Sequence, residues 1–355
     1  MNDQPGERQE QLNQWARTQL QHLHAHSSPQ SLTLEPLVGD AGCRRYYRLN
    51  TEPSLLAVDA PPDVENAHRF KELADYLRRH HIAVPNVAAV DSERGFLLLE
   101  DFGDRLLLHA LRQQPESATA LYGESLMQLL ALQQTPASDV LPAYDQPRLR
   151  RELDLFDQWF LKELLDYDLS DSERTMLDQL FAQLEASALE QPRVAVHRDY
   201  HSRNLLIRPD GCLGIVDFQD AVWGPITYDL ASLLKDCYIR WPADQVRQWA
   251  LGYGNMAAGI GLLEGITEEQ FLRWFDWMGL QRHLKVLGIF GRLALRDQKP
   301  RYLDNLALVI RYVLEVAARY PELSDFRYWF EHSVLPHARA QSWYRDYRQA
   351  GDEAA

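Results

Sequence analysis

Short apolar runs bounded by polar turn residues dominate the N-terminal part of the chain. Runs of this length that are rich in Leu, Val and aromatic residues are typical of β-strands. Tight turns at residues 39–42 and around Pro53 separate the first three runs and predict an antiparallel meander. Apolar positions at helical spacing predict one helix over residues 7–24 and a second that begins at Asp63. The expected strands are residues 32–37, 45–49, 55–59, 87–90 and 95–99.

Beyond residue 105 the apolar positions recur mainly at the spacing of α-helices. Ser170 and Glu173 form a capping box that marks the start of one helix. One exception is a predicted β-hairpin, in which apolar residues 205–207 and 213–216 are joined by a Pro-Asp-Gly turn. The expected helices are residues 105–112, 116–134, 149–166 and 170–190, and the whole chain from 228 onward is expected to be helical.

These patterns predict an α+β protein with two lobes. Residues 1–103 form the smaller lobe, with an N-terminal helix and a five-stranded antiparallel sheet. Residues 104–355 form a larger, mainly helical lobe that carries the hairpin and the loop before it. Apolar character drops around Gly103, so we expect the chain to bend there.

The amino-acid composition limits which kinds of partner and which cellular compartment we expect for this protein. A net charge of −14, without clusters of Lys and Arg, argues against nucleic acid as the main partner. No apolar run approaches the roughly 20 residues that span a bilayer, so we expect no membrane contact. Cys43, Cys212 and Cys237 lie far apart, as in proteins of a reducing compartment, and no signal segment is recognisable at the N-terminus. We expect a cytoplasmic protein, and nothing indicates an obligate protein partner.

The most informative segment begins after the apolar run at residues 194–196. His197, Arg198 and Asp199 are followed by Asn204 with the spacing of a kinase catalytic loop, H-R-D-x-x-x-x-N. Such a loop places an Asp beside the transferring phosphoryl group, where it accepts the proton of an alcohol, and an Asn where its oxygen binds a metal ion. We therefore expect Asp199 to be the catalytic base, Asn204 a Mg²⁺ ligand and His197 a residue that braces the loop.

The hairpin returns the chain to this loop. Asp217 follows its second strand, where a carboxylate next to Asn204 can link Mg²⁺ to the phosphates of ATP. A helix begins soon afterwards, near Asp229, which we expect to orient the catalytic loop. No A-P-E segment of the kind that holds a peptide substrate intervenes, and this favours a small-molecule acceptor.

These motifs, together with the run from Gly224 to Ala231, resemble those of the aminoglycoside phosphotransferase family. The resemblance covers most of the chain and implies a protein-kinase-like bilobal fold that uses ATP and Mg²⁺. A narrower resemblance, carried by residues 39–48, 58–62, 95–103, 235–241 and 278–285, is to its bacterial branch of cell-wall-recycling amino-sugar kinases. It implies transfer of the γ-phosphoryl group to the anomeric hydroxyl of N-acetylmuramate and N-acetylglucosamine. A cationic acceptor, such as an aminoglycoside or choline, and a non-catalytic nucleotide-binding scaffold are the alternatives.

Two positions depart from the kinase pattern. Asp59 stands where the third strand of a kinase carries the Lys that holds the α- and β-phosphates. Gln219 replaces the Gly of the D-F-G signature. We expect cations from the neighbouring strand to replace the Lys, with Asp59 as their partner, although surface strand residues would look the same. These candidates are Arg44, Arg45 and Arg48.

The remaining candidates concern the nucleotide base and the acceptor. Backbone groups near Glu100 and Phe102 are expected to hydrogen-bond adenine. Polar residues in the loop, and inside otherwise apolar helices, are expected to line the acceptor pocket, although exposed side chains would show the same pattern. Aromatic residues near 274–290 could stack on a sugar but at helical spacing are more often core. The acceptor candidates are His201, Arg203, Asp236, Arg240, Gln281, Arg282, His283 and Lys285.

Overall fold

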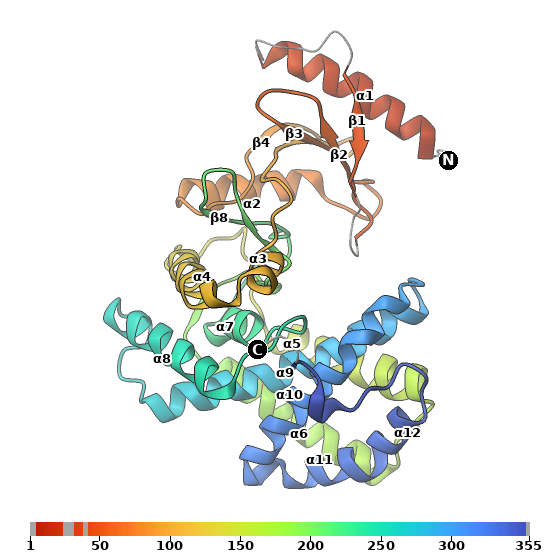
Figure 1. The fold of residues 1–355 in the computed structure, drawn as a ribbon, viewed down its shortest axis with the longest axis vertical. Coiled ribbons are helices and arrows are strands. Elements are labelled where there is room, and N and C mark those ends of the chain that lie inside the picture. Colours follow the sequence, from red (N-terminus) through yellow and green to blue (C-terminus); the bar gives the residue numbers. More distant parts are fainter. Residues whose placement is uncertain (1–4, 24–31, 38–41, 353–355) are drawn as a thin grey trace. The chain divides into compact units, whose positions relative to one another are not determined.

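The chain divides into two compact units (Figure 1). The structure is a computed structural model that describes residues 5–23, 32–37 and 42–352. One unit contains Met1–Arg105 and Leu205–Asp220, and the other contains Leu106–Asn204 and Ala221–Ala355. The expected boundary after Gly103 stays a prediction, and the packing groups the hairpin with the N-terminal unit.

A five-stranded antiparallel sheet forms the centre of the first unit, in the order β1-β2-β3-β5-β4. This confirms the predicted meander and the α+β class, while residues 39–41 of the predicted turn lie outside the described residues. The strands are β1 (Leu34–Pro36), β2 (Arg45–Leu49), β3 (Leu55–Asp59), β4 (Val87–Asp91) and β5 (Phe96–Glu100).

Two helices pack on this sheet. Helix α1 (Pro5–His22) buries Trp15 against one face, together with Ala57 and Leu98. Because side chains alternate along a strand, Leu99 points to the other face, where it shares a small cavity with Phe70 of helix α2 (Ala67–Arg79).

The expected start of α2 at Asp63 is wrong. The N–H groups of Val64 and Glu65 donate to the Pro61 carbonyl, so this segment forms a turn instead of the first helical turn. Asn66 is the N-cap, and its side chain accepts the N–H of Arg69 at 2.9 Å.

The predicted hairpin is confirmed and belongs to the first unit. Strands β7 (Leu205–Ile207) and β8 (Leu213–Ile215) pair antiparallel. Phe102 packs so closely on this hairpin that a Cβ atom at Gly214 would lie 2.5 Å from its ring. Only a glycine therefore fits at this position of β8.

Helices make up most of the second unit, as predicted. The capping box of Ser170 and Glu173 is present at the start of α6. The predicted helix over residues 149–166 begins earlier and continues beyond Leu155 with π-helical hydrogen bonding. The α-helices are α3 (Leu107–Gln113), α4 (Ala118–Gln133), α5 (Gln146–Leu155), α6 (Asp171–Leu189), α7 (Thr227–Leu234), α8 (Ala243–Gly259), α9 (Glu268–Leu295), α10 (Leu306–Arg319), α11 (Ser324–Trp329) and α12 (Leu335–Arg339). The π-helical segments are η2 (Phe156–Leu164) and η5 (Phe330–Val334), and the 3₁₀ segments are η1 (Pro115–Ser117), η3 (Pro300–Asn305), η4 (Pro321–Leu323) and η6 (Tyr347–Gln349).

Helix α9 is the central element of this unit. It packs against α5, α6, α7, α10 and η2 and is buried along most of its length. Gly288 permits the closest approach, since a Cβ atom there would lie 2.2 Å from the Leu155 carbonyl oxygen. Trp277 and Phe290 belong to the hydrophobic core, which supports the interpretation that these aromatic side chains are core residues and not a platform that stacks on a sugar.

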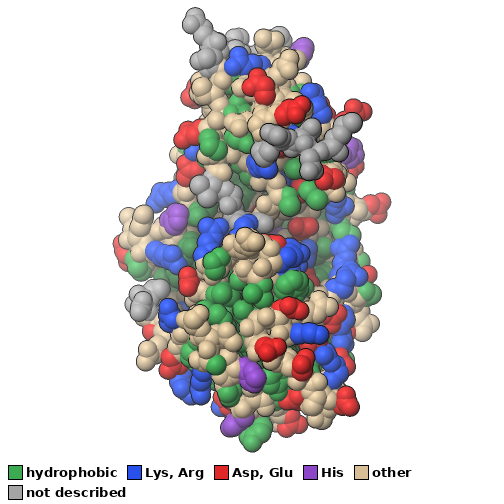
Figure 2. Space-filling view, turned by 90° about the vertical axis from the view of Figure 1, so that its right-hand side faces the viewer, with side chains coloured by type: hydrophobic (Ala, Val, Ile, Leu, Met, Phe, Trp, Pro, Cys, Tyr) green, Lys and Arg blue, Asp and Glu red, His purple; other side chains and the backbone are tan. Residues whose placement is uncertain are grey.

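A short sheet that the sequence pattern did not predict positions the loop. Strand β6 (Arg193–Val196) pairs antiparallel with β9 (Val222–Pro225), and β6 ends immediately before His197. Strand β9 contains Gly224 and Pro225, residues that usually weaken or end strands. No helix in the described ranges is long and apolar enough to cross a membrane. On the face shown in Figure 2, acidic and basic side chains are interspersed.

Candidate active site

The loop from His197 to Asn204 is anchored to helix α7 through Asp229. The carboxylate of Asp229 accepts the backbone N–H groups of His197 at 2.6 Å and of Arg198 at 3.0 Å. Arg198 has a φ of 78°, a conformation that costs a non-glycine residue energy and persists only where the surroundings hold it. Burial raises the pKa of Asp229 to about 6, against the attraction of His197. Asp229 thus fixes the entrance of the loop.

Two further bonds fix the backbone of Asp199. Its N–H donates to Nδ1 of His197 at 3.3 Å, and its carbonyl accepts Nδ2 of Asn204 at 3.0 Å. The loop therefore brings His197, Asp199 and Asn204 together. Because Nδ2 of Asn204 is directed at Asp199, the amide presents Oδ1 as the atom that can bind a cation.

The Asp199 carboxyl is half-buried in a strongly positive environment. Burial would raise its pKa, but Lys285, His201 and Arg198, with a further contribution from Arg282, lower the pKa well below its ordinary range. The carboxyl is therefore ionised at neutral pH, as a proton acceptor must be.

One residue of this environment was missed from the sequence. The buried Glu152 of α5 accepts hydrogen bonds from Arg198 and from Tyr144, and Nζ of Lys285 lies 3.2 Å away. Its position between Leu149 and Phe156 on the apolar face of the predicted helix was the one available signal, since a charged residue there is unusual.

Asp236 also holds the loop. Its Oδ2 accepts both the N–H and the hydroxyl of Ser202, at 3.0 and 2.5 Å, and its Oδ1 accepts the N–H of Tyr238 at 3.0 Å. With 1% exposure, Asp236 is a buried anchor, not the acceptor ligand that we expected. The guanidinium carbon of Arg203 lies 4.6 Å from the ring centroid of Tyr238, and the His201 ring packs on the same ring with 5.4 Å between centroids.

The polar residues in the middle of α9 are buried. This excludes the alternative interpretation of their sequence pattern, in which they would lie on the protein surface. Arg282 donates to Sγ of Cys237 at 3.6 Å and lies close enough to Asp199 to lower its pKa. His283 stacks on Tyr312 with 4.8 Å between ring centroids. The amide of Gln281 has no hydrogen-bond partner in the described structure.

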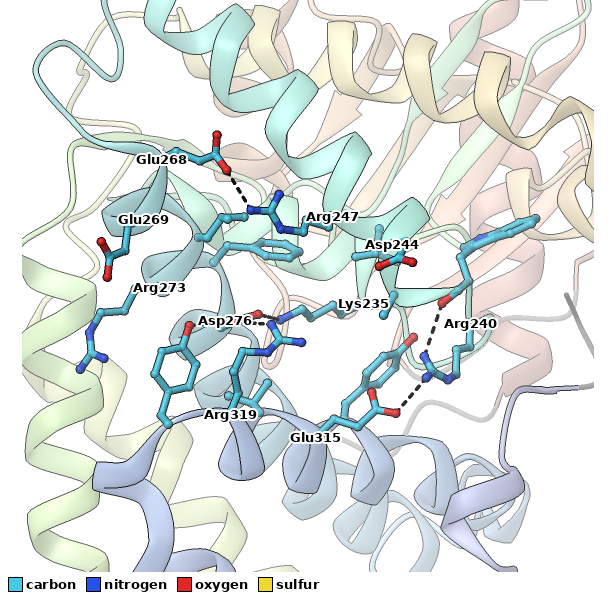
Figure 3. A pocket seen from close by; sticks show the side chains of 18 of the residues that line it. Lys235, Arg240, Asp244, Arg247, Glu268, Glu269, Arg273, Asp276, Glu315 and Arg319 are labelled. Carbon is cyan, nitrogen blue, oxygen red and sulfur yellow. Dashed lines mark hydrogen bonds and ion pairs between the residues drawn. The ribbon is translucent and has the colours of Figure 1, made fainter.

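Arg240 lies apart from this loop. It donates to Glu315 at 2.8 Å and lines a cavity of about 830 Å³ in the second unit, whose lining does not include Asp199 or Arg282 (Figure 3). Lys235 and Asp276 form an ion pair of 2.7 Å in the same wall. The structure thus gives no support to Arg240 as a residue of the acceptor pocket.

The first unit contains a small cavity of about 80 Å³ with Asp217 in its wall. Asp217 has a φ of 63°, and its Oδ1 accepts Nε2 of Gln219 at 2.8 Å. The N–H of Glu100 donates to the carbonyl of Asn86 at 2.8 Å, so this N–H is already used and is not the adenine contact that we expected. The cavity is lined by Leu37, Tyr46, Arg48, Leu56, Phe70, Pro85, Leu99, Glu100, Asp101, Phe102, Gly103, Leu206, Val216, Asp217 and Phe218.

The three arginines of the expected phosphate site differ in their partners. Arg48 is bound to Asp101 at 2.6 Å and Asp104 at 2.7 Å. Arg45 is exposed. Arg44 forms a 2.6 Å ion pair with Glu65 and lies over the ring of Phe70.

The expected pairing of Asp59 with one of these arginines is wrong. Asp59 is bound by Arg8 of α1, at 2.5 Å between Nη2 and Oδ1. This pair could not be predicted from the sequence, because its members lie on different elements and only the packing of α1 on the sheet brings them together.

The fold and the loop define a phosphotransferase of the protein-kinase-like class. An ethanolamine kinase from Plasmodium vivax has the same fold, with a TM-score of 0.61 and 13% identity over 91% of this chain and 97% of the other. The family model described as the phosphotransferase enzyme family (APH) matches residues 33–271. The chain belongs to this family, as the sequence motifs predicted.

Relatives at higher identity narrow the comparison. The N-acetylmuramate/N-acetylglucosamine kinase of Pseudomonas aeruginosa is 42% identical over 293 residues, which cover 82% of this chain and 86% of the relative. The protein of the same name from Pseudomonas putida is 38% identical over 322 residues, covering 90% and 94%. The narrower resemblance found in the sequence is thereby confirmed.

Proposed function

We propose that this protein transfers the γ-phosphoryl group of ATP to the anomeric hydroxyl of N-acetylmuramate and N-acetylglucosamine. The observation that carries the proposal is the 42% identity with the Pseudomonas aeruginosa kinase of that name, over most of both chains. The product would be a sugar 1-phosphate, and the activity would serve peptidoglycan recycling in the cytoplasm.

In the proposed reaction Asp199 orients the anomeric hydroxyl and accepts its proton as the oxygen attacks the γ-phosphorus. A base kept ionised by surrounding cations is a weak proton acceptor in the ground state, which suits a loose transition state in which the proton moves late. Its low pKa, its backbone bonds to His197 and Asn204, and the anchoring of the two preceding residues by Asp229 support this role.

The donor atoms fit a magnesium ion. Asn204 presents an amide oxygen and Asp217 a carboxylate, and hard oxygen ligands are those that Mg²⁺ prefers. When bound, the ion would neutralise the phosphate oxygens of ATP. We propose that these two residues hold it.

Arg44 is our candidate for the cation that replaces the strand lysine. Its ion pair with Glu65, which lies just before α2, has the character of the Lys and Glu pair that positions phosphates in kinases. The ring of Phe70 beneath Arg44 packs on Phe218, the neighbour of Asp217, at 4.8 Å between centroids. We assign the adenine contacts to backbone groups around Phe102 and to the carbonyl of Glu100, beside the small cavity.

The acceptor pocket is expected beside Asp199, with His201, Arg203, Gln281, Arg282 and Lys285 as its candidate polar residues. The cations Arg198, Arg282 and Lys285 act on Asp199 together, so a positively charged acceptor would be repelled there. This disfavours aminoglycosides and choline.

The test is ADP release from MgATP with one acceptor at a time: N-acetylmuramate, N-acetylglucosamine, kanamycin and choline. We expect turnover with the two sugars. Turnover with only the cationic acceptors would overturn the proposed substrate class, and ATP binding without turnover on any acceptor would overturn the proposal of catalysis by this chain.

A further inference from the structure

Glu152 occupies an unusual position for a carboxylate. It is 7% exposed, lies on helix α5, and is surrounded by side chains that come from four other segments of the second unit. Arg198 and Tyr144 donate hydrogen bonds to it, the hydroxyl of Tyr228 lies at 3.4 Å, and Nζ of Lys285 lies at 3.2 Å.

Two of these partners are the cations next to Asp199. Arg198 is the residue before Asp199 and has a left-handed backbone. Its side chain, bound to Glu152, adds a second attachment at this strained point to the one that Asp229 makes with its N–H. Lys285 donates to Tyr228 at 2.9 Å as well as approaching Glu152. A buried pair of cations without a counter-ion would repel each other and be strongly unfavourable.

We propose that Glu152 is a positioning residue for the catalytic base: it holds Arg198 and Lys285 together and thereby fixes the loop that carries Asp199. This inference rests on the proposed phosphoryl transfer. In many protein kinases a phosphate added to the activation loop orders that loop by pairing with arginine. Here the anion is part of helix α5, so the loop is held without modification.

Replacement of Glu152 by Gln tests the proposal, because it keeps the shape and removes the charge. Loosening of the loop displaces the base, and a displacement of about 1 Å costs about a hundredfold in rate. We expect kcat to fall by about that factor, with the KM for ATP within about threefold of its original value, since no nucleotide contact changes.

The control is Glu185→Gln. Glu185 of α6 is also buried, at 1% exposure, and is bound by Arg150 and by Gln146 at 2.8 Å, but it has no contact with the loop. Both variants break a buried ion pair, so both lose stability. Only Glu152→Gln is expected to lose kcat, and equal kcat losses in the two variants would overturn the proposal.

The pH profile separates positioning from simple loss of stability. Lys285 faces Glu152, Tyr228, Arg198 and Asp199. Burial lowers its pKa, but Glu152, Tyr228 and Asp199 together outweigh burial and the repulsion from Arg198, so the pKa stands above its ordinary value. Removing the charge of Glu152 takes away the largest influence that raises this pKa, so the alkaline limb of kcat is expected to move to lower pH in Glu152→Gln but not in Glu185→Gln. An unmoved limb contradicts the proposal.

Hydrogen exchange supplies a readout that needs no substrate. Amides of residues 197–204 are expected to exchange at least tenfold faster in Glu152→Gln than in Glu185→Gln, even if the sugars prove to be the wrong acceptors. If Glu152→Gln does not fold, Arg198→Met removes the other end of the bridge and is compared in the same way. Exchange and kcat that stay within threefold of the unmodified protein in whichever variant folds would overturn the proposal.

Discussion

The side-chain amide of Asn204 donates to the backbone carbonyl of Asp199 over 3.0 Å. The N–H group of this residue fixes the loop, and its oxygen is the atom that we propose binds Mg²⁺, so one residue would combine two tasks. The two tasks can be separated, because Asp in place of Asn keeps an oxygen ligand and lacks the donor.

Asn204→Ala is expected to lower kcat about a hundredfold and to raise the Mg²⁺ concentration needed for half-maximal rate, because it removes both groups. Asn204→Asp should restore the Mg²⁺ requirement while leaving much of the loss in kcat. Magnesium titrations of the two variants decide this. Identical titration curves for both variants would show that Asn204 is not a metal ligand.

Asp229→Asn should change how stability depends on pH. The folded pKa of Asp229, about 6, lies above the ordinary 3.8, so its contribution to stability is fully present below the unfolded pKa and is lost as pH rises through about 6. The free energy of unfolding of the unmodified protein, relative to Asp229→Asn, should therefore fall by about 2 kcal/mol between about pH 4 and pH 7. Urea unfolding across this range measures it, and a difference that grows with pH would refute the assignment.

Arg44→Met is expected to raise the KM for ATP tenfold to a hundredfold, the equivalent of about 1.5–3 kcal/mol for a charge-assisted contact. Arg45→Met, one residue further along the chain, is the matched control, since the Arg45 side chain is exposed. Initial rates at varied ATP measure both. Equal effects would mean that Arg44 has no special part in phosphate binding.

Arg282→Gln should distinguish the two sugars. Arg282 is 3% exposed and forms no ion pair within the described structure, its hydrogen-bond partner being the thiol of Cys237. A buried cation in this state favours an anionic ligand, and N-acetylmuramate differs from N-acetylglucosamine by a lactyl carboxylate. We expect kcat/KM to fall about tenfold or more for N-acetylmuramate alone. A matching fall for both sugars would assign Arg282 to the phosphoryl group instead.

The residues that could be predicted are those whose relation is local in the sequence. His197, Asp199 and Asn204 lie within one loop, and the Pro-Asp-Gly turn predicts the hairpin that follows. The capping box at Ser170 is likewise local.

The remaining features depend on which distant segments pack together. Arg198 and Glu152 are 46 positions apart, and Arg8 and Asp59 are 51 positions apart. The polar positions within α9 were visible in the sequence, but only the packing of neighbouring helices shows that they are buried. Asp236 was expected to contact the acceptor and is instead buried against the loop, and this too depends on packing between distant segments.

The central claim is that Asp199 is the base of a sugar kinase, and Asp199→Asn tests it most directly. The measurement is ADP release from MgATP with N-acetylmuramate, together with the Kd for ATP. We predict that transfer falls by a factor of 10² to 10⁴ while the Kd for ATP changes little. Transfer within tenfold of the unmodified protein, or loss of ATP binding, would contradict the account.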